Sequence, residues 1–260
     1  MECIRCESKR TRKDGQTRLG GHRWRCNGCG RRFTARSTSA FPNDVVALAI
    51  RWYGRYRLSS ADGVEWFAER GGVVDRGTIY RWGQRFLPLF GEAARLHRRA
   101  VGAKWRVDQT SGRLQGRWTS VFRAIDQDGE VVEAYFSQRR NSNAAQAFFE
   151  HALDETGVRP ERVTTDKAKC YPVALRAVLA DTEHRTSKYR NTGIERDHGH
   201  LNERLYPMRG FKQEASAGII TRGRARVGNL RNGFSSLTLH VVLNLRLAVA
   251  WPHLTLAIEA

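Results

Sequence analysis

Two strand-like runs that end in an aspartate, and one helix-like segment that opens on a glutamate, constrain this chain more than any other feature. Asp108 and Asp166 each follow a short apolar or β-branched run, and Glu195 begins the segment 195–205. Carboxylates this far apart in the sequence converge only by folding, and converging carboxylates repel unless a cation lies between them. Divalent hard cations prefer carboxylate oxygens. The three acids therefore predict a metal-binding pocket.

The chain is also strongly basic. Its 260 residues include 45 Lys and Arg against 26 Asp and Glu, which gives a formal net charge of +19. Most of the cations are arginines, whose planar guanidinium suits phosphate contacts and stacking on bases. Together with an acidic metal pocket, this charge indicates an enzyme that cuts or joins nucleic acid. A generically basic protein, such as a ribosome-associated one, is the alternative.

No segment has the pattern of a membrane span or a signal peptide. The most apolar stretch, 237–258, is broken by His240, Asn244, Arg246 and Pro252, so it predicts a buried helix. The N-terminus opens without an apolar run. We therefore expect a cytoplasmic protein with no membrane partner.

Four cysteines near the N-terminus form two Cys-x-x-Cys pairs, Cys3 with Cys6 and Cys26 with Cys29. Two such pairs at this separation supply four thiolates for tetrahedral zinc. The intervening residues 7–25 are too polar to form a core without a metal. The pattern predicts one structural zinc ion in a zinc ribbon over residues 1–36. A redox-active dithiol pair or a coincidence is the alternative.

Residues 44–88 have the pattern of three short helices. The first is expected at 45–56, the second opens at Ser59 or Ser60, and the third spans 77–86 after a cap at Asp75 or Thr78. This arrangement is typical of a helix-turn-helix domain, which we place at 40–92. The third helix carries Arg76, Arg81 and Arg85, as a DNA-recognition helix would. Packing alone is the alternative role for such helices.

From residue 104 the pattern changes to strands. Strands are expected at 104–110, 117–126, 130–137, 162–165 and 182–187, and helices at 143–155, 168–180 and 195–205. Three strands followed by alternating helices and strands are the order of an RNase H-like core. The predicted fold class is thus α/β, with a mixed five-stranded sheet and helices at 100–215. A basic segment and an apolar helix follow at 216–260.

Several phrases of this region resemble the IS-six family of insertion-sequence transposases, over about residues 40–234. They are Trp105-Arg-Val-Asp-Gln-Thr110, Phe122-Arg-Ala-Ile-Asp-Gln-Asp-Gly129, Thr165-Asp-Lys167, Asp181-Thr-Glu-His-Arg185, Ile194-Glu-Arg-Asp-His198 and Pro207-Met-Arg-Gly-Phe-Lys212. The zinc ribbon resembles that of a subset of the family. Each phrase alone is weak, and together they are specific.

The resemblance implies a DDE transposase. Asp108, Asp166 and Glu195 match the catalytic acids, which in this family bind two Mg²⁺ (or Mn²⁺) ions. Transposon ends and target DNA would be the double-stranded partners. A homodimer or higher homo-oligomer is expected, because two transposon ends must be processed together. Its expected location is the cytoplasm of a prokaryotic cell, in association with the nucleoid.

Further DNA contacts are expected from Lys167, Arg204 and Lys212. The sequence departs from the family in three ways. Gln109 replaces the acidic residue usual after the first aspartate, and Asn202 stands where the family usually has Lys or Arg. Fewer residues than usual separate the second aspartate from the glutamate. None of these departures removes a metal ligand.

The predicted function is DNA transposition: binding of terminal inverted repeats, metal-dependent cleavage of 3′ ends and strand transfer into target DNA. One alternative is a domesticated, catalytically silent DNA-binding protein with the same fold. The acidic triad argues against it, because a retired site has no reason to keep three repelling acids. Another is a nuclease for RNA–DNA hybrids, which the DNA-binding modules disfavour.

Overall fold

The computed structural model describes residues 3, 6, 8–16, 22–30, 32–34, 41–56, 58–187, 194, 199 and 210–259. The chain forms two compact units, residues 1–46 and 47–260. Within the part of the chain that the structure describes, none of the helices combines the length and apolar character needed to span a bilayer.

The first unit is built around a small antiparallel sheet. Strands β1 (Thr11–Gln16), β2 (His22–Cys26) and β3 (Arg32–Thr34) pair in that order. The residues of β1 are exposed or half-buried, so this strand buries no side chain fully. The buried residues that cluster here are Cys3 and Cys26, with Trp24 and Cys29 packed against them. Cysteine sulfurs therefore occupy the centre of this unit.

Three helices follow: α1 (Asn43–Arg55), α2 (Ser60–Ala68) and α3 (Arg76–Arg95). Ser59 caps α2 in a capping box with Asp62, and the Asp75 carboxylate accepts the Thr78 N–H at the start of α3. Both caps were among the predicted candidates. The predicted end of the third helix at Phe86 is wrong, because α3 continues through Pro88 to Arg95. Its buried positions also continue past Phe86, and this burial offsets the hydrogen bond lost at the proline.

The central sheet has five strands in the order β6-β5-β4-β7-β8. Strands β4 (Lys104–Leu114), β5 (Arg117–Ile125) and β6 (Val131–Ser137) are antiparallel, whereas β7 (Arg162–Thr165) and β8 (Glu183–Thr186) run parallel to β4. Helix α4 (Ser142–Thr156) connects β6 to β7, and α5 (Cys170–Val178) connects β7 to β8. This topology confirms the predicted RNase H-like fold class.

One face of the sheet is covered by α4 and α5. Phe122 of β5 stacks on Phe148 of α4 with ring centroids 5.8 Å apart, and meets the edge of Tyr171 of α5 at 6.3 Å. These three residues belong to one buried cluster with Trp105 and Val107 of β4. Burying each large apolar side chain contributes about 1.5–3 kcal/mol. This cluster therefore fixes the ends of β4 and β7 relative to both helices.

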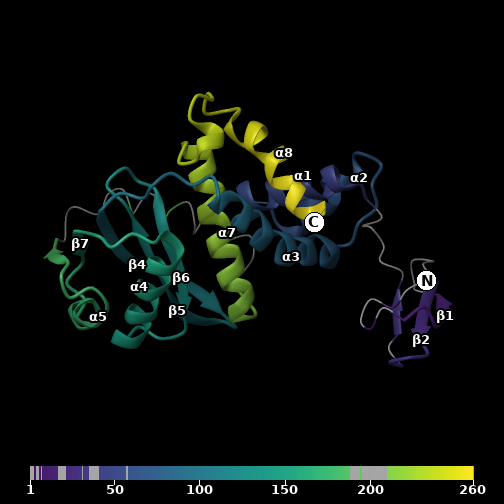
Figure 1. The fold of residues 1–260 in the computed structure, drawn as a ribbon, viewed down its shortest axis with the longest axis horizontal. Coiled ribbons are helices and arrows are strands. Elements are labelled where there is room, and N and C mark those ends of the chain that lie inside the picture. The colour runs from purple at the N-terminus through teal and green to yellow at the C-terminus, as the bar shows by residue number, and fades with distance from the viewer. Residues whose placement is uncertain are drawn as a thin grey trace. The chain divides into compact units, whose positions relative to one another are not determined.

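Helix α7 (Glu214–Asn232) packs against the β6 side of the sheet and runs between the sheet and α3 (Figure 1). Asn229 of α7 is buried against the edge strand β6. Its Oδ1 accepts the Val131 N–H at 2.9 Å, and its Nδ2 donates to the Val131 carbonyl at 2.8 Å. The Asn229 amide thus pairs with backbone groups that β6, as an edge strand, does not pair with another strand. The basic segment predicted from residue 216 is therefore largely a packed helix.

Two arginines of α7 are used inside the molecule. The Arg226 guanidinium donates to Glu155 of α4 at 2.9 Å, and that of Arg224 donates to the Gly54 carbonyl at 2.9 Å. A short 3-10 helix, η1 (Ser236–Thr238), and α8 (Arg246–Glu259) complete the chain. Trp251 of α8 packs on Phe90 of α3 with centroids 5.0 Å apart. The helical part of the apolar tail thus packs on its own chain. The prediction of one buried helix over 237–258 is wrong in its first half, where residues 239–245 form turns and Val242 is 67% exposed.

Candidate active site

The sheet brings the two predicted aspartates together. Strands β4 and β7 are parallel neighbours in which Arg106 lies opposite Thr164. Asp108 lies two residues after Arg106, and Asp166 lies two residues after Thr164. Adjacent strands lie about 4.8 Å apart, so equal register places the two carboxylates at the same edge of the sheet. This geometry follows from the apolar runs that precede both aspartates.

Each carboxylate is oriented by the backbone next to it. Asp108 Oδ1 accepts the Gln109 N–H at 2.8 Å, and Asp166 Oδ1 accepts the Ala168 N–H at 2.9 Å. The second oxygen of Asp166 lies 3.9 Å from Nη2 of Arg140, in the loop between β6 and α4. Asp166 remains 34% exposed in this arrangement. A partly exposed oxygen donor with one fixed oxygen fits a hard divalent cation.

A buried arginine lies on the same face of the sheet as Asp108. Arg123 of β5 is opposite Asp108 in the ladder and opposite Ala134 of β6, and it is only 1% exposed. Directly opposed residues project to the same face. A guanidinium buried this deeply requires polar or anionic partners, and the acidic residue in register with it is Asp108. Sequence reasoning missed Arg123, although an arginine within an otherwise apolar strand was a usable signal.

Glu195 and Arg204 lie outside the described residues, as does Asn202. Ile194, directly before Glu195, is described and fully buried. It belongs to a cluster with Ile125, Val131 and Ala134 of the sheet and Ala225 of α7. Ala134 shares its sheet face with Asp108, as the register shows. The chain therefore passes over the face of Asp108 one residue before Glu195.

A neutral polar group lies on the other face, beneath the aspartates. Gln109 is opposite Phe122 in the ladder, and its Nε2 lies 3.8 Å from the Cys170 Sγ. Among the described residues, neither Gln109 Oε1 nor the buried Tyr171 hydroxyl has a hydrogen-bond partner. Burial raises the pKa of Tyr171, and the nearby charges of Asp166 and Asp108 raise it further. Gln109 thus projects away from the face of Asp108, so its lack of charge removes no ligand there.

The predicted DNA contacts fall into two groups. Arg76, Arg81 and Arg85 are exposed on α3, where Arg81 donates to the Thr78 hydroxyl at 2.7 Å. Lys167, next to Asp166, and Lys212 are exposed as well. Sequence reasoning missed Arg140, which lies nearer to an aspartate than its place in the sequence suggests. Its only signal was its position in a basic loop that follows a strand.

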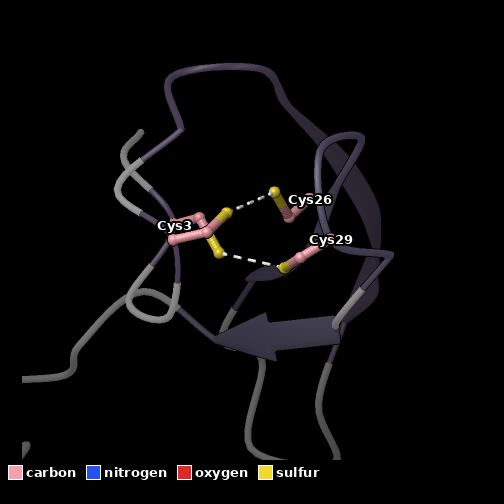
Figure 2. Close-up of side chains that lie close together, drawn as sticks. Cys3, Cys26 and Cys29 are labelled. Carbon is pink, nitrogen blue, oxygen red and sulfur yellow. Dashed lines mark hydrogen bonds between the residues drawn. The ribbon is translucent and has the colours of Figure 1, made fainter.

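The four N-terminal cysteines converge on one point, and Figure 2 shows three of them, Cys3, Cys26 and Cys29, facing one another. All four sulfurs lie within 4.8 Å of one another, with Cys3 and Cys29 at 3.6 Å and Cys6 and Cys26 at 3.6 Å. Four sulfurs about 2.3 Å from a tetrahedral zinc are separated by roughly 3.8 Å, whereas a disulfide requires about 2.05 Å. The cluster therefore has the dimensions of a zinc site.

The backbone around Cys26 favours its thiolate. The Cys29 N–H lowers the pKa of Cys26 to about 6, and Gly28, whose N–H donates to the Cys26 Sγ at 3.3 Å, acts in the same direction. Metal ligation requires the thiolate form. The local turn thus prepares Cys26 as a ligand.

The sheet order and the adjacent aspartates define an RNase H-like catalytic core. Residues 102–233 match a family described as a DDE domain, DDE_Tnp_IS240. The transposase of the insertion sequence-like element IS431mec from Staphylococcus aureus strain Mu50 is 34% identical over 169 residues, 63% of this chain and 75% of the relative. The transposase of IS257 in transposon Tn4003 from Staphylococcus aureus has the same identity over the same shares.

Among solved structures, the HTLV-2 integrase catalytic core domain in complex with magnesium (trimeric form) gives a TM-score of 0.39 at 16% identity. The match covers 55% of this chain and 99% of that chain. The family and sequence matches, together with the fold, confirm the resemblance inferred from the motifs. The chain belongs to the IS-six family of DDE transposases. It is accordingly a nucleotidyl transferase that acts in DNA transposition.

Proposed function

We propose that this transposase binds the terminal inverted repeats of its own element, cleaves the 3′ ends and transfers them into target DNA. Asp108, Asp166 and Glu195 hold two Mg²⁺ or Mn²⁺ ions. The observation that carries the proposal is the register of β4 and β7, which brings Asp108 beside Asp166. The burial of Ile194 on the face of Asp108 supports Glu195 as the third acid.

The donor set fits the metal. Carboxylate oxygens are the ligands that Mg²⁺ prefers, and a site on one edge of a sheet leaves room for water and substrate. Metal bound there would supply positive charge at the reacting phosphate and an activated oxygen nucleophile. The chain's own residues have the remaining tasks: the Gln109 and Ala168 N–H groups fix one oxygen of each aspartate. No covalent protein intermediate is needed.

Basic residues near the site and on α3 would hold the DNA. Arg140 and Lys167 flank Asp166, where the phosphate backbone must approach. Arg76, Arg81 and Arg85 of α3 would contact the repeats, with Arg204 and Lys212 contacting DNA near the core. Each phosphate contact releases condensed counterions, so we expect binding to weaken steeply with salt.

One zinc ion bound by Cys3, Cys6, Cys26 and Cys29 would hold the N-terminal sheet together. The sulfur separations and the favoured thiolate of Cys26 support this assignment. A homodimer or higher oligomer, acting on DNA in the cytoplasm, follows from the need to process two ends together.

Strand transfer is the direct test. A labelled oligonucleotide carrying the element end is incubated with a plasmid, with Mg²⁺ or Mn²⁺ and then with chelator. We expect metal-dependent joining by the wild-type chain, and its loss in Asp108→Asn, Asp166→Asn and Glu195→Gln. Asp128→Asn is the matched control, because Asp128 is an exposed turn acid that pairs with Arg99 at 3.8 Å. Its joining should match the wild type.

Two outcomes would contradict the proposal. Undiminished joining by Asp108→Asn or Glu195→Gln would remove that residue from the catalytic set. Specific binding of the element end by the wild-type chain, without joining at saturating metal and with zinc bound, would identify a domesticated DNA-binding protein instead.

A further inference from the structure

Strands β4 and β5 extend beyond the rest of the sheet as a hairpin that presents a tryptophan to solvent. Trp118 lies opposite Arg113 in the ladder and is 66% exposed. The Arg113 guanidinium carbon lies 4.7 Å from the Trp118 ring centroid, within range of a cation–π contact. A single exposed apolar side chain needs no explanation. The surroundings of Trp118 distinguish it from such a residue.

The hairpin tip is held rigidly. Gln115 and Gly116 form its two-residue turn with φ of 51° and 80°, as a type I′ turn requires. A positive φ is unfavourable for glutamine. Two hydrogen bonds to a distant segment hold it in place: the Gln115 N–H donates to the Phe211 carbonyl at 2.8 Å, and the Phe211 N–H donates to the Arg113 carbonyl at 2.7 Å.

The segment at 210–212 fits closely against this tip. Gly210 has φ of 86°, and a Cβ there would lie 2.9 Å from the Arg113 carbonyl oxygen, so a larger residue could not approach. The Gln115 Nε2 also donates to the Lys212 carbonyl at 3.2 Å. Trp118 therefore lies on a hairpin whose backbone is fixed by residues 210–212, and this lowers the entropic cost of binding a partner through its ring.

Cations lie near this aromatic ring. Arg113 contacts it, whereas Arg117, the next residue along β5, is exposed on the other face of the hairpin, and Lys212 is exposed on the segment at 210–212. Aromatic rings beside cations are the arrangement that binds single-stranded nucleic acid: bases stack on the ring while the cations contact phosphates. An unpaired base offers a full face for stacking, whereas a base within a duplex offers only its edges in the grooves.

We propose that Trp118 is a stacking platform for an unpaired DNA base, with Arg113 contacting an adjoining phosphate. This inference rests on the proposed function and deepens it. Position 113 lies five residues beyond Asp108 on β4 and, like Gln109, projects to the other face of the strand, so the platform lies beside the carboxylates and not among them.

The test compares two DNA probes in binding to the full chain with zinc bound: a 20-nucleotide dT strand and a 20-base-pair duplex of mixed sequence, both followed by fluorescence anisotropy. Trp118→Ala should weaken binding of the single strand roughly 5- to 100-fold, and of the duplex less than about 2-fold. Trp118→Phe, which keeps a ring, should recover most of the loss. Leu96→Ala is the control, because Leu96 is 81% exposed and lies outside the hairpin.

Salt dependence separates stacking from charge. Trp118→Ala removes no cation, so its slope of log affinity against log salt should equal that of the wild type. Arg113→Gln removes one phosphate contact and should reduce the slope for the single strand by about 0.7. Circular dichroism of each variant checks that the fold is retained.

Each outcome bears on a different proposal. Equal binding of the dT strand by wild type and Trp118→Ala would overturn the stacking platform, as would an equal loss for both probes. In the first case the exposed ring would fit a protein partner better than DNA. Failure of the wild-type chain to bind either probe would instead count against the proposed DNA-binding function itself.

Discussion

The ion pair between Arg140 and Asp166 should affect the binding of metal and the binding of DNA in opposite directions. The Arg140 Nη2 lies 3.9 Å from Asp166 Oδ2, the oxygen that the backbone leaves free for a metal. A guanidinium at this position competes with a divalent cation for the same carboxylate. Replacing Arg140 by alanine should therefore tighten metal binding and weaken DNA binding.

The geometry sets the size of the effect. Two unit charges at 3.9 Å interact by about 4 kcal/mol at an effective dielectric of about 20, and by about 1 kcal/mol in bulk water. Arg140 and Asp166 are 61% and 34% exposed, so the lower value applies. A change of about 1 kcal/mol corresponds to about 5-fold in Kd. We expect the Kd for Mn²⁺ to fall by about 2- to 5-fold in Arg140→Ala.

The assay is titration of the full chain with Mn²⁺ in the absence of DNA, followed by electron paramagnetic resonance of the free ion. Arg139→Ala is the matched control, because Arg139 is the exposed neighbour and removes the same charge. An equal gain in both variants would show a general field effect rather than competition. Unchanged or weaker Mn²⁺ binding in Arg140→Ala would refute the reasoning.

Three further predictions follow from other contacts. Cys26→Ser should abolish bound zinc and make the N-terminal sheet sensitive to protease; a protease-resistant ribbon without zinc, by atomic emission, would contradict the metal site. Asn229→Ala leaves the buried Val131 N–H without its partner, while the Val131 carbonyl keeps the Arg98 guanidinium at 2.9 Å, so urea denaturation should show a loss of about 1–3 kcal/mol; a loss below about 0.5 kcal/mol would contradict this. Burial raises the pKa of Glu133, opposed by its backbone hydrogen bond to the Ala134 N–H and by the charge of Arg222. A carboxyl group whose pKa is raised in the folded state contributes its full stability at pH values below its unfolded-state pKa of about 4.3. That contribution is lost as the pH rises through the folded-state pKa. Glu133→Gln should therefore gain stability relative to wild type as pH rises from 4 to 8, and parallel urea midpoints would rule this out.

The order of strands and helices in the core could be read from local patterns. Alternation and apolar runs place β4, β5, β6 and β7 within a few residues of their observed bounds, because one or both faces of each strand must be buried. The same runs place Asp166 directly after its strand, but the prediction that Asp108 ends a strand is wrong, because β4 continues to Leu114 as one arm of a hairpin. The pairing of parallel strands then brings the two aspartates together without any further information.

The surroundings of the aspartates depend on tertiary contacts and could not be predicted. Arg140 reaches Asp166 only because the loop after β6 crosses the edge of the sheet. Arg123 lies opposite Asp108 only through the β4–β5 register. The end of α3 was misjudged because Pro88 is a strong local stop signal, and only the buried contacts beyond it sustain the helix.

Ion pairs of two arginines, Arg226 and Arg98, help to determine how α3 lies against the catalytic sheet. Arg226 of α7 reaches Glu155 of α4 at 2.9 Å and Glu92 of α3 at 3.6 Å, and Arg98, just beyond α3, donates to the buried Glu130 at 2.6 Å. Ion pairs of this kind add little net stability, since desolvation offsets most of the attraction. They do penalise other arrangements, because a shift of one helical turn would leave buried charges unpaired. Apolar packing alone tolerates such shifts better. We infer that these pairs hold α3 in one register relative to Asp108 and Asp166, so DNA held on α3 would meet the carboxylates at a fixed distance.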